Sequence, residues 1–520
     1  MAYIDKYGVE FSDDRKVLIK FPIDYSGSYK IPEGVETIEE GSFKEDYGLG
    51  GQPQYKGCDG LLSIDIPNSL KDIDIILKWC KKLQQVLVDE SNPFYCIDNG
   101  VLFDKDKKIL KKYFRTEPQD CYIVPDSVQK IAEYAFADNA YIASVDVRNV
   151  ISIGERAFES CESLEYIQMP NVQDIKQYAF CLCKSLRTVV LPLSLQIINA
   201  SLFYNCSALE SVIIPDSVSQ IAGNAFGECK NLKSISIPDS VDYINGSAFV
   251  GTEIYNDMSN WEGGVLYIGH SLIKASKSIS GTYTIKNGTI QICDYAFYHC
   301  DNLKTVILPE GVVCIGNGAF CQCERLTKVA LPETLKEIGS GAFDNCISLS
   351  LIVSTDSLSF EGIYINLVDI KIPNNVITIK AGAFANCKSM RSIAFPEGLS
   401  NIGWGTCTNC QELRTVCLPS TIKSIENFAF RGCSALESIN LPDGLSSVGY
   451  NVFEDCFSIN EIIVSRKFQD QFRAMKGLED VVFRIVGRDS ETAISSNRRS
   501  WNDLKRIWID LYHNIEEGNT

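Results

Sequence analysis

Apolar and polar positions repeat along most of the chain at intervals of 22 or 23 residues. Each interval is marked by a Phe, usually preceded by Ala and followed three residues later by Cys. These Phe residues are Phe136, Phe158, Phe180, Phe203, Phe226, Phe249, Phe297, Phe320, Phe343, Phe384, Phe430 and Phe453, and Cys407 fills one missing slot. Such regularity predicts a repeat protein, in which stacked units bury a core that no single unit could bury.

The unit at residues 208–229, "ALESVIIPDSVSQIAGNAFGEC", shows what each position predicts. Inward apolar residues alternate with outward Ser211 and Ile213, which indicates a short strand with one buried face. Pro215 ends the strand because it has no N–H to give to a ladder. The residues around Phe226 predict a short helical turn. Because every unit repeats the strand in one direction, we expect one long parallel sheet of about 18 rungs, on the order of 85 Å long.

Longer intervals predict β-hairpins inserted between rungs, near residues 7–22, 99–114 and 263–275. The first hairpin would also cover the N-terminal edge of the sheet. The expected parts of the chain are an N-terminal hairpin cap and first rung with a Gly-rich loop (1–56), the repeat solenoid with its two inserted hairpins (57–465), a C-terminal cap (466–488), and a linker with an amphipathic helix (489–520).

The amphipathic helix is predicted from apolar residues that recur at spacings of three and four. They are Trp501, Leu504, Trp508, Leu511 and Ile515. Ser500 and Asp503 resemble a capping box at its start. This helix either folds back onto the last rungs as a helical cap or docks on a partner.

The repeats "CESLEYIQMP", "CKNLKSISIP" and "CSALESINLP" resemble the BspA-like leucine-rich repeat family of bacterial and protist proteins. Thirteen of the 17 prolines follow the strand, where commoner leucine-rich repeats have Asn, so no asparagine ladder is expected. The resemblance implies a leucine-rich-repeat solenoid that binds other proteins, with cell-surface adhesion or host interaction as a candidate role.

Composition narrows the class of partner. The chain has 520 residues, a net charge of −17, 45% hydrophobic and 22% charged residues, which is typical of a folded protein. An acidic surface repels phosphate backbones, so nucleic acid is not expected as a partner. The apolar runs are too short for an integral membrane segment. We expect a protein or peptide ligand.

Cysteine is the strongest compositional signal, with 21 residues, of which thirteen occupy the repeat slot after the Phe. Pairs such as Cys181 with Cys183 and Cys407 with Cys410 fall in different rungs without a nearby His, so neither a metal site nor a cofactor is expected. The slot favours small buried thiols that pack as hydrophobes and stay reduced. The three histidines, His270, His299 and His513, lie far apart in the sequence, and no catalytic residue is predicted.

The candidate binding surface is the outward side of the strands, where small hydroxyls alternate with aliphatic residues. It comprises Tyr166, Thr188, Val190, Ser211, Ile213, Ser234, Ser236, Thr305 and Ile307. A long, flat face of this kind suits a protein or peptide better than a small molecule, which needs a concave pocket. The leading hypothesis is therefore a non-enzymatic interaction protein.

An intracellular scaffold or regulator, which docks a partner with the solenoid and the C-terminal helix, is the alternative. The sequence starts without a basic stretch followed by an apolar run, which favours a cytoplasmic location. A processed form would be at the cell surface or secreted. Fractionation of native cells would separate adhesion from an intracellular role.

Overall fold

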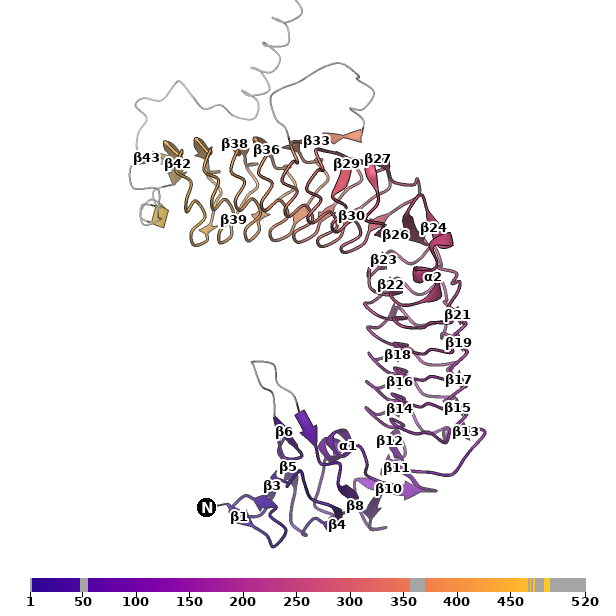
Figure 1. Cartoon of the computed structure of the whole chain (residues 1–520). Coiled ribbons are helices and arrows are strands. Elements are labelled where there is room, and N and C mark those ends of the chain that lie inside the picture. Colours follow the sequence, from indigo (N-terminus) through magenta and orange to yellow (C-terminus); the bar gives the residue numbers. More distant parts are fainter. Residues whose placement is uncertain are drawn as a thin grey trace, which may run out of the picture.

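The computed structural model describes residues 2–46, 55–355, 370–465, 468, 471–472 and 481–486. Figure 1 shows a hook made of an N-terminal unit, an N-terminal arm (residues 95–249), an elbow, and a C-terminal arm (residues 271–465). The fold is the expected parallel solenoid of about 18 turns with inserted hairpins.

The N-terminal unit contains the first hairpin, in which β2 and β3 pair antiparallel. Its elements are β1 (Tyr3–Ile4), β2 (Glu10–Phe11), β3 (Val17–Lys20), β4 (Gly27–Lys30), β5 (Thr37–Ile38), β6 (Lys44–Asp46), β7 (Tyr55–Gly57), β8 (Leu61–Ile66), α1 (Asp74–Trp79) and β9 (Gln85–Val88). The ends of the Gly-rich segment at 44–57 pair as the antiparallel strands β6 and β7. Strands β4, β8 and β9 begin the parallel stack.

The strands of the repeats form an outer ladder, which lies on the outer side of the hook in Figure 1. Its members are β13 (Tyr122–Ile123), β15 (Ser144–Asp146), β17 (Tyr166–Gln168), β19 (Thr188–Val190), β21 (Ser211–Ile213), β27 (Ser280–Thr284), β29 (Asn302–Ile307), β31 (Lys328–Leu331), β33 (Leu351–Ser354), β34 (Ile370–Lys371), β36 (Ser392–Ala394), β38 (Thr415–Cys417), β40 (Ser438–Asn440), β42 (Glu461–Ser465) and β43 (Val482–Val486). All neighbours that pair in it are parallel, but it is divided into separate sheets rather than the expected continuous one.

A second, inner ladder carries the chain back across the stack and faces the inside of the hook (Figure 1). Its members are β12 (Ile109–Tyr113), β14 (Lys130–Ile131), β16 (Ser152–Ile153), β18 (Asp174–Ile175), β20 (Ile197–Ile198), β22 (Gln220–Ile221), β23 (Tyr243–Ile244), β26 (Ser271–Ala275), β28 (Gln291–Ile292), β30 (Cys314–Ile315), β32 (Glu337–Ile338), β35 (Thr378–Ile379), β37 (Asn401–Ile402), β39 (Ser424–Ile425) and β41 (Ser447–Val448). Hairpins enter it through β10 (Tyr95–Asp98), β11 (Val101–Asp104), β24 (Trp261–Glu262) and β25 (Val265–Ile268).

The turn that carries the Phe is not helical, which corrects the expected helical turn. Residues two before and two after the Phe have positive φ, as in Arg156 (54°) and Ser160 (58°) around Phe158. A helix needs negative φ at every residue, so these two positions interrupt it. They direct N–H groups at the next rung instead, as in the bond from Ser160 N–H to Cys181 O of 2.8 Å. We call the side chains on this turn the turn face.

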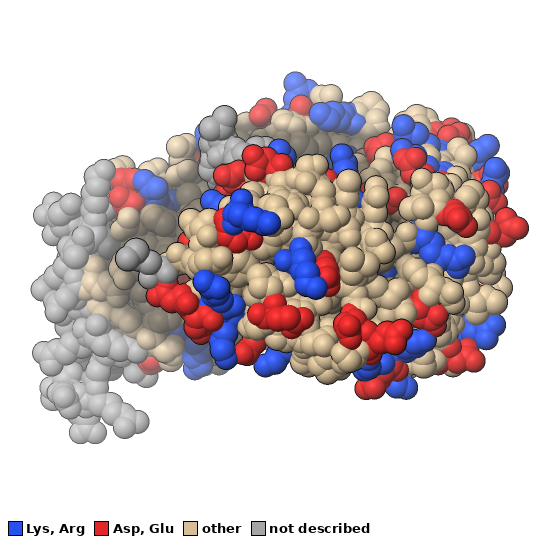
Figure 2. All heavy atoms as spheres, turned by 90° about the horizontal axis from the view of Figure 1, so that it is seen from below, with Lys and Arg blue, Asp and Glu red and all other residues tan. Residues whose placement is uncertain are grey.

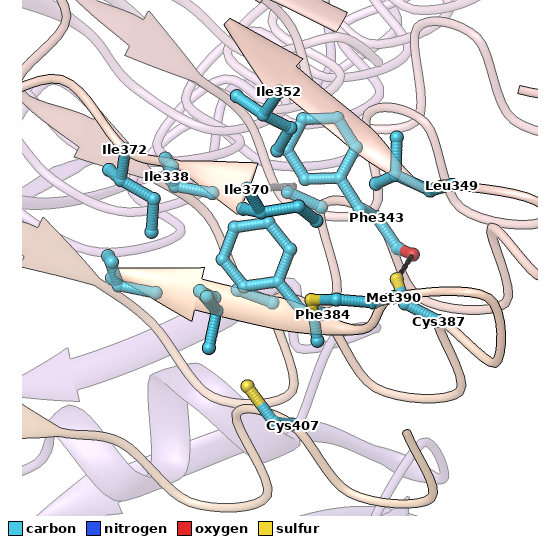
Figure 3. Close-up of a cluster of buried hydrophobic side chains, with 14 of the residues drawn as sticks. Ile338, Phe343, Leu349, Ile352, Ile370, Ile372, Phe384, Cys387, Met390 and Cys407 are labelled. Carbon is cyan, nitrogen blue, oxygen red and sulfur yellow. Dashed lines mark hydrogen bonds between the residues drawn. The ribbon is translucent and has the colours of Figure 1, made fainter. Parts of the chain in front are cut away.

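The Phe rings stack in a column through each arm. Phe320 and Phe343 lie 5.3 Å apart between centroids at an interplanar angle of 3°, and both are fully buried. Figure 3 shows the next pair, Phe343 over Phe384, with Cys407 standing in the slot of the following rung. The Phe ring of each rung therefore packs against the Phe rings of the rungs before and after it.

The cysteine slot has a polar function as well as a packing one. The Sγ of Cys387 donates to the carbonyl oxygen of Phe343 in the preceding rung at 3.2 Å (Figure 3). The same bond, of 3.0 or 3.1 Å, joins Cys206 to Phe180 and Cys346 to Phe320. All thirteen slot cysteines are buried, as expected. Packing alone predicted a small apolar residue here, and the structure adds a hydrogen-bond donor.

The elbow lies between β23 and β28, where α2 (Glu253–Asn256), the 3-10 helix η1 (Met258–Asn260) and the third hairpin are inserted. The buried Gln291 joins the arms, because its amide accepts from Ile244 N–H at 2.9 Å and donates to Ile244 O at 3.2 Å. The side chain of Gln291 thus makes the hydrogen bonds to Ile244 that a neighbouring strand backbone makes between ordinary rungs.

The end of the stack differs in part from expectation. Strand β43 adds in parallel to β42, which matches the terminal strand expected in the cap. Of residues 466–480, in which the cap helix was expected, only 468 and 471–472 are described, and the linker and amphipathic helix at 489–520 lie outside the described residues. The helical part of the cap stays a prediction.

Candidate functional site

The outer ladder of the N-terminal arm presents the predicted alternation. In β19 and β21 the middle residues are buried, while Thr188, Val190, Ser211 and Ile213 are exposed. Val190 lies opposite Ile213 in register, and the two are 46% and 56% exposed. Tyr166 in β17 is also exposed. These five residues form what we call the outer patch.

The other four predicted residues do not extend this patch. Ser234 and Ser236 are exposed, but they lie outside any strand. The next layer beside them contains α2 and η1 instead of a strand, and Ile254 N–H bonds there to Leu232 O. Thr305 and Ile307 lie in β29 and are half-buried.

The outward positions of the C-terminal arm differ in accessibility from rung to rung: Thr415, Ser438 and Asn440 are exposed, whereas others are buried. Ala330, Ser392 and Ala394 occupy the same register positions as Thr305 and Ile307, and their exposed fractions are 0%, 8% and 6%. The outer ladder is therefore not one uniform binding face, and its accessible aliphatic pair lies in the N-terminal arm.

An open depression of about 330 Å³ lies beside the outer patch, at the start of the N-terminal arm. It is lined by Pro118 and Gln119 of the loop after the second hairpin and by Tyr141, Ser163 and Glu165 of the following rungs. The repeat pattern did not predict it, because the loop that forms one wall lies outside the repeat.

The described residues include no group of three or more His, Cys, Asp and Glu side chains arranged to hold a metal ion. His270 is bound on both sides, with Nε2 3.1 Å from Asp239 Oδ1 and Nδ1 3.0 Å from Gly288 O. The Asp239 hydrogen bond raises the pKa of His270. His299 lies 3.5 Å from Asp301. Both pairs hold turns together, and His513 is outside the described residues.

Burial governs the chemistry of the thiols. Desolvation raises the pKa of Cys161, Cys206 and Cys346, so little thiolate forms near neutral pH. Cys58 differs, because a hydrogen bond with Cys80 lowers its pKa. None of the 21 cysteines is joined in a disulfide in the structure. These features fit thiols that pack in the core and form hydrogen bonds between neighbouring rungs.

Charge is mixed over the surface. Figure 2, viewed from below the hook, shows basic side chains interspersed with acidic ones on that face. Ion pairs between rungs account for part of this mixing, as in Lys184–Glu162 (2.6 Å) and Arg148–Asp126 (3.2 Å). No helix within the described ranges has both the length and the apolar character that a membrane crossing requires.

The predicted docking helix, with Trp501, Leu504, Trp508, Leu511 and Ile515, lies outside the described residues. Its docking stays a prediction.

Comparison with known proteins identifies the repeat. The family model described as BspA type leucine-rich repeat region (6 copies) matches residues 107–175, 151–280, 266–363 and 353–473, which together span more than half of the chain. No curated protein sequence matches the chain.

Several solved structures are similar over most of the chain. A leucine-rich cell surface protein from Faecalibacterium prausnitzii is 22% identical, with 80% of this chain and 94% of that chain covered and a TM-score of 0.30. A leucine-rich repeat protein from Bacteroides ovatus is 19% identical, with 94% and 98% covered and a TM-score of 0.31. The pneumococcal vaccine antigen PcpA is 15% identical, with 76% and 99% covered and a TM-score of 0.35.

Proposed function

The chain belongs to the BspA type leucine-rich repeat family, and we propose that it is a non-enzymatic binding protein that docks a protein or peptide on its outer patch. The observation that carries this proposal is the exposed pair Val190 and Ile213, which lie opposite each other on adjacent strands. Thr188 and Ser211 flank the pair with hydroxyl groups that can donate and accept.

Burial of this pair would provide part of the affinity. Complete burial of an aliphatic side chain contributes about 1.5–3 kcal/mol relative to full exposure, and these two are roughly half exposed. Tyr166 adds an aromatic ring on the neighbouring strand β17, and Tyr is enriched at protein interfaces. The patch is flat, as a protein or peptide partner requires.

The role that we propose, with support from family membership, is adhesion at a cell surface or interaction with a host. Nucleic acid is not expected as a partner, because the chain carries a net charge of −17 and its basic side chains pair with acids of neighbouring rungs.

The test is a pull-down from native extract with the full chain, followed by mass spectrometry, comparing the wild type with the double variant Val190→Asp and Ile213→Asp. Two buried, unpaired carboxylates in the interface would remove the partner. Asn440→Asp is the matched control, because Asn440 is exposed in β40 at the same position after the buried central residue. Equal recovery of every captured protein by all three chains would refute the patch, provided that their melting temperatures agree.

A further inference from the structure

The turn face of the C-terminal arm has an arrangement that the outer patch does not explain. Side chains two before and one after the Phe lie next to each other there: a Cβ built on Gly341 would lie 3.6 Å from Asp344 Cβ. On Gly405 it would lie 3.1 Å from Thr408 Oγ1. These positions therefore form adjacent columns that run along the arm from rung to rung.

The column two before the Phe is glycine in four consecutive rungs. These are Gly318, Gly341, Gly382 and Gly405, with φ between 57° and 64°. The backbone does not demand glycine at this position, because Arg156 (φ 54°) and Tyr178 (φ 59°) occupy it in the N-terminal arm. Gly341 and Gly382 are thus partly exposed where the N-terminal arm carries side chains, while Gly318 lies beneath the ring of Tyr295 and Gly405 is buried.

Exposed aromatic residues stand at both ends of the glycine column. Tyr295 is 53% exposed, and its ring lies over Gly318, where an added Cβ would be 2.5 Å from its Cε1. Trp404 is 51% exposed and contacts Phe428 edge to face, with 5.8 Å between centroids. The rungs of Tyr295 and Trp404 are four steps apart, or roughly 19 Å at the usual strand spacing.

A row of amides borders the glycines, two residues after each Phe or its substitute. They are Gln322, Asn345, Asn386 and Asn409. Asn409 donates to Asn386 at 3.1 Å, and Asn386 donates to Asp344 at 2.8 Å, which links three successive rungs. The Oε1 atom of Gln322 is shielded from solvent and has no hydrogen-bond partner among the described residues. Because this atom is shielded, a hydroxyl of a ligand can reach it only when the amide turns toward solvent.

We propose that this shelf, from Tyr295 to Trp404 with its glycine column and amide row, binds an unbranched neutral polysaccharide. The apolar faces of pyranose rings pack against exposed Tyr and Trp rings, which combine a large apolar area with a polar group. Amides both donate to and accept from sugar hydroxyls. One amide per rung presents the same groups at a regular interval, as a polymer of identical units requires.

Charge favours a neutral ligand over an anionic one. In the three columns between the aromatic ends, across the rungs of Gly318 to Gly405, Asp344 is the only charged residue. A carboxylate would repel phosphate, sulfate or uronate groups, whereas it accepts hydrogen bonds from hydroxyls. This proposal is independent of the outer patch, which lies in the other arm.

The test is native affinity electrophoresis of the full chain in gels that contain the neutral polysaccharides laminarin, xylan or hydroxyethylcellulose, or the anionic polysaccharide heparin. We expect retardation in at least one of the neutral gels. Trp404→Ala and Tyr295→Ala should each weaken the binding about tenfold. The double variant Gly341→Tyr and Gly382→Tyr should abolish it, because it covers the shelf with a residue that Tyr178 shows to be compatible with this backbone.

Tyr7→Ala is the matched control, since it removes an exposed tyrosine from the N-terminal unit, outside both proposed surfaces. It should bind as the wild type does, and all variants should keep the wild-type melting temperature. The proposal is overturned if none of the neutral gels retards the protein, if the shelf variants migrate like the wild type, or if only the heparin gel retards it. Loss of a captured protein in the shelf variants, without loss of polysaccharide binding, would also overturn it.

Discussion

The two arms repeat the same rung but present different surfaces. At the position two before the Phe, the N-terminal arm carries Arg156 and Tyr178, whereas the C-terminal arm carries Gly341 and Gly382. Inside, the arms agree: stacked rings are 4.6 to 5.7 Å apart in the first and 4.9 to 5.8 Å in the second. Stacking determines the inward positions and leaves the outward columns free to differ in function.

The exposure of outward side chains on the outer ladder also differs between the two arms. Val190 and Ile213 are exposed in the N-terminal arm, while Ala330 and Ala394 are buried in the C-terminal arm. The two surfaces that we propose therefore lie on the strand face of one arm and on the turn face of the other. Each surface can change independently of the other, because a rung contacts mainly its neighbours.

The largest effect is expected from the Phe column and tests whether the arms are independent. Phe180→Ala and Phe320→Ala each remove a fully buried ring between two stacked neighbours, at a cost of about 3–5 kcal/mol. Because rungs contact mainly their neighbours, amide hydrogen exchange should accelerate only in the arm that carries the substitution. Phe457→Ala is the control, since that ring is 69% exposed. Faster exchange throughout both arms would show a single cooperative unit.

A smaller effect is expected where the hairpins join the arms, at Lys112 and its counterpart Lys274. Lys112 is buried, its Nζ donates to Tyr134 O at 2.7 Å, and burial lowers its pKa to about 8. The unfolded chain binds this proton up to about pH 10.4, so Lys112 by itself contributes stability that rises between pH 8 and pH 10.4, by about 3 kcal/mol. The buried thiols act in the opposite direction, because their raised pKa keeps protons on the folded chain that the unfolded chain loses above about pH 8.5. Below pH 8 the Lys112 amine is charged in the folded chain, so burial of that charge lowers the free energy of unfolding by its full amount.

Lys112→Met and Lys274→Met each remove the buried amine from one arm, so the pH dependence of their free energies of unfolding compares the two arms. Lys274 makes the same bond, to Tyr295 O, and burial lowers its pKa too, but it is less buried. Urea unfolding at pH 8 and pH 10.4 should show that stability falls more steeply with pH in Lys112→Met than in the wild type, by about 3 kcal/mol, and that Lys274→Met differs from the wild type less. Equal pH dependence in Lys112→Met and the wild type would show that the Lys112 amine does not contribute.

The sequence predicted the inward pattern well because stacking repeats it. Strand positions, the Phe column, the hairpins and the buried cysteines all follow from one template. The turn was misjudged because the positive φ of Arg156 and Leu182 has no signal in residues that usually avoid that region. Ser234 was placed on a strand because the template cannot show that α2 and η1 replace the next rung. Outward exposure was predicted uniformly and differs from rung to rung, as half-buried Thr305 and exposed Thr415 show.

The elbow is the next smaller target. Gln291→Met keeps the length of the side chain but leaves the buried N–H of Ile244 without its acceptor, at a cost of about 2 kcal/mol. Cys293 still donates to Ile244 O at 3.1 Å, so one bond of the junction remains. Hydrogen exchange should accelerate at residues 243–246 and leave the middle of each arm unchanged. Unchanged protection at Ile244 would mean that backbone contacts alone hold the arms together.

The smallest perturbation leaves the fold intact and compares the thiols of the two arms. A maleimide reagent, applied without reductant, should label Cys121 first, because it is exposed. The half-buried Cys96, Cys314, Cys321 and Cys417 should follow slowly, and burial raises the pKa of each of them. Peptide mapping should therefore find the fast site in the N-terminal arm.

After denaturation in the same unreduced buffer, all 21 cysteines should react. We expect this because most slot thiols donate their proton to a carbonyl of the preceding rung and a disulfide would remove that donor, as at Cys346. If the denatured protein instead shows few free thiols, the slot cysteines are paired, the ladder of Sγ–H bonds is wrong, and the chain has folded in an oxidising compartment. That outcome would strengthen the case for adhesion at a cell surface.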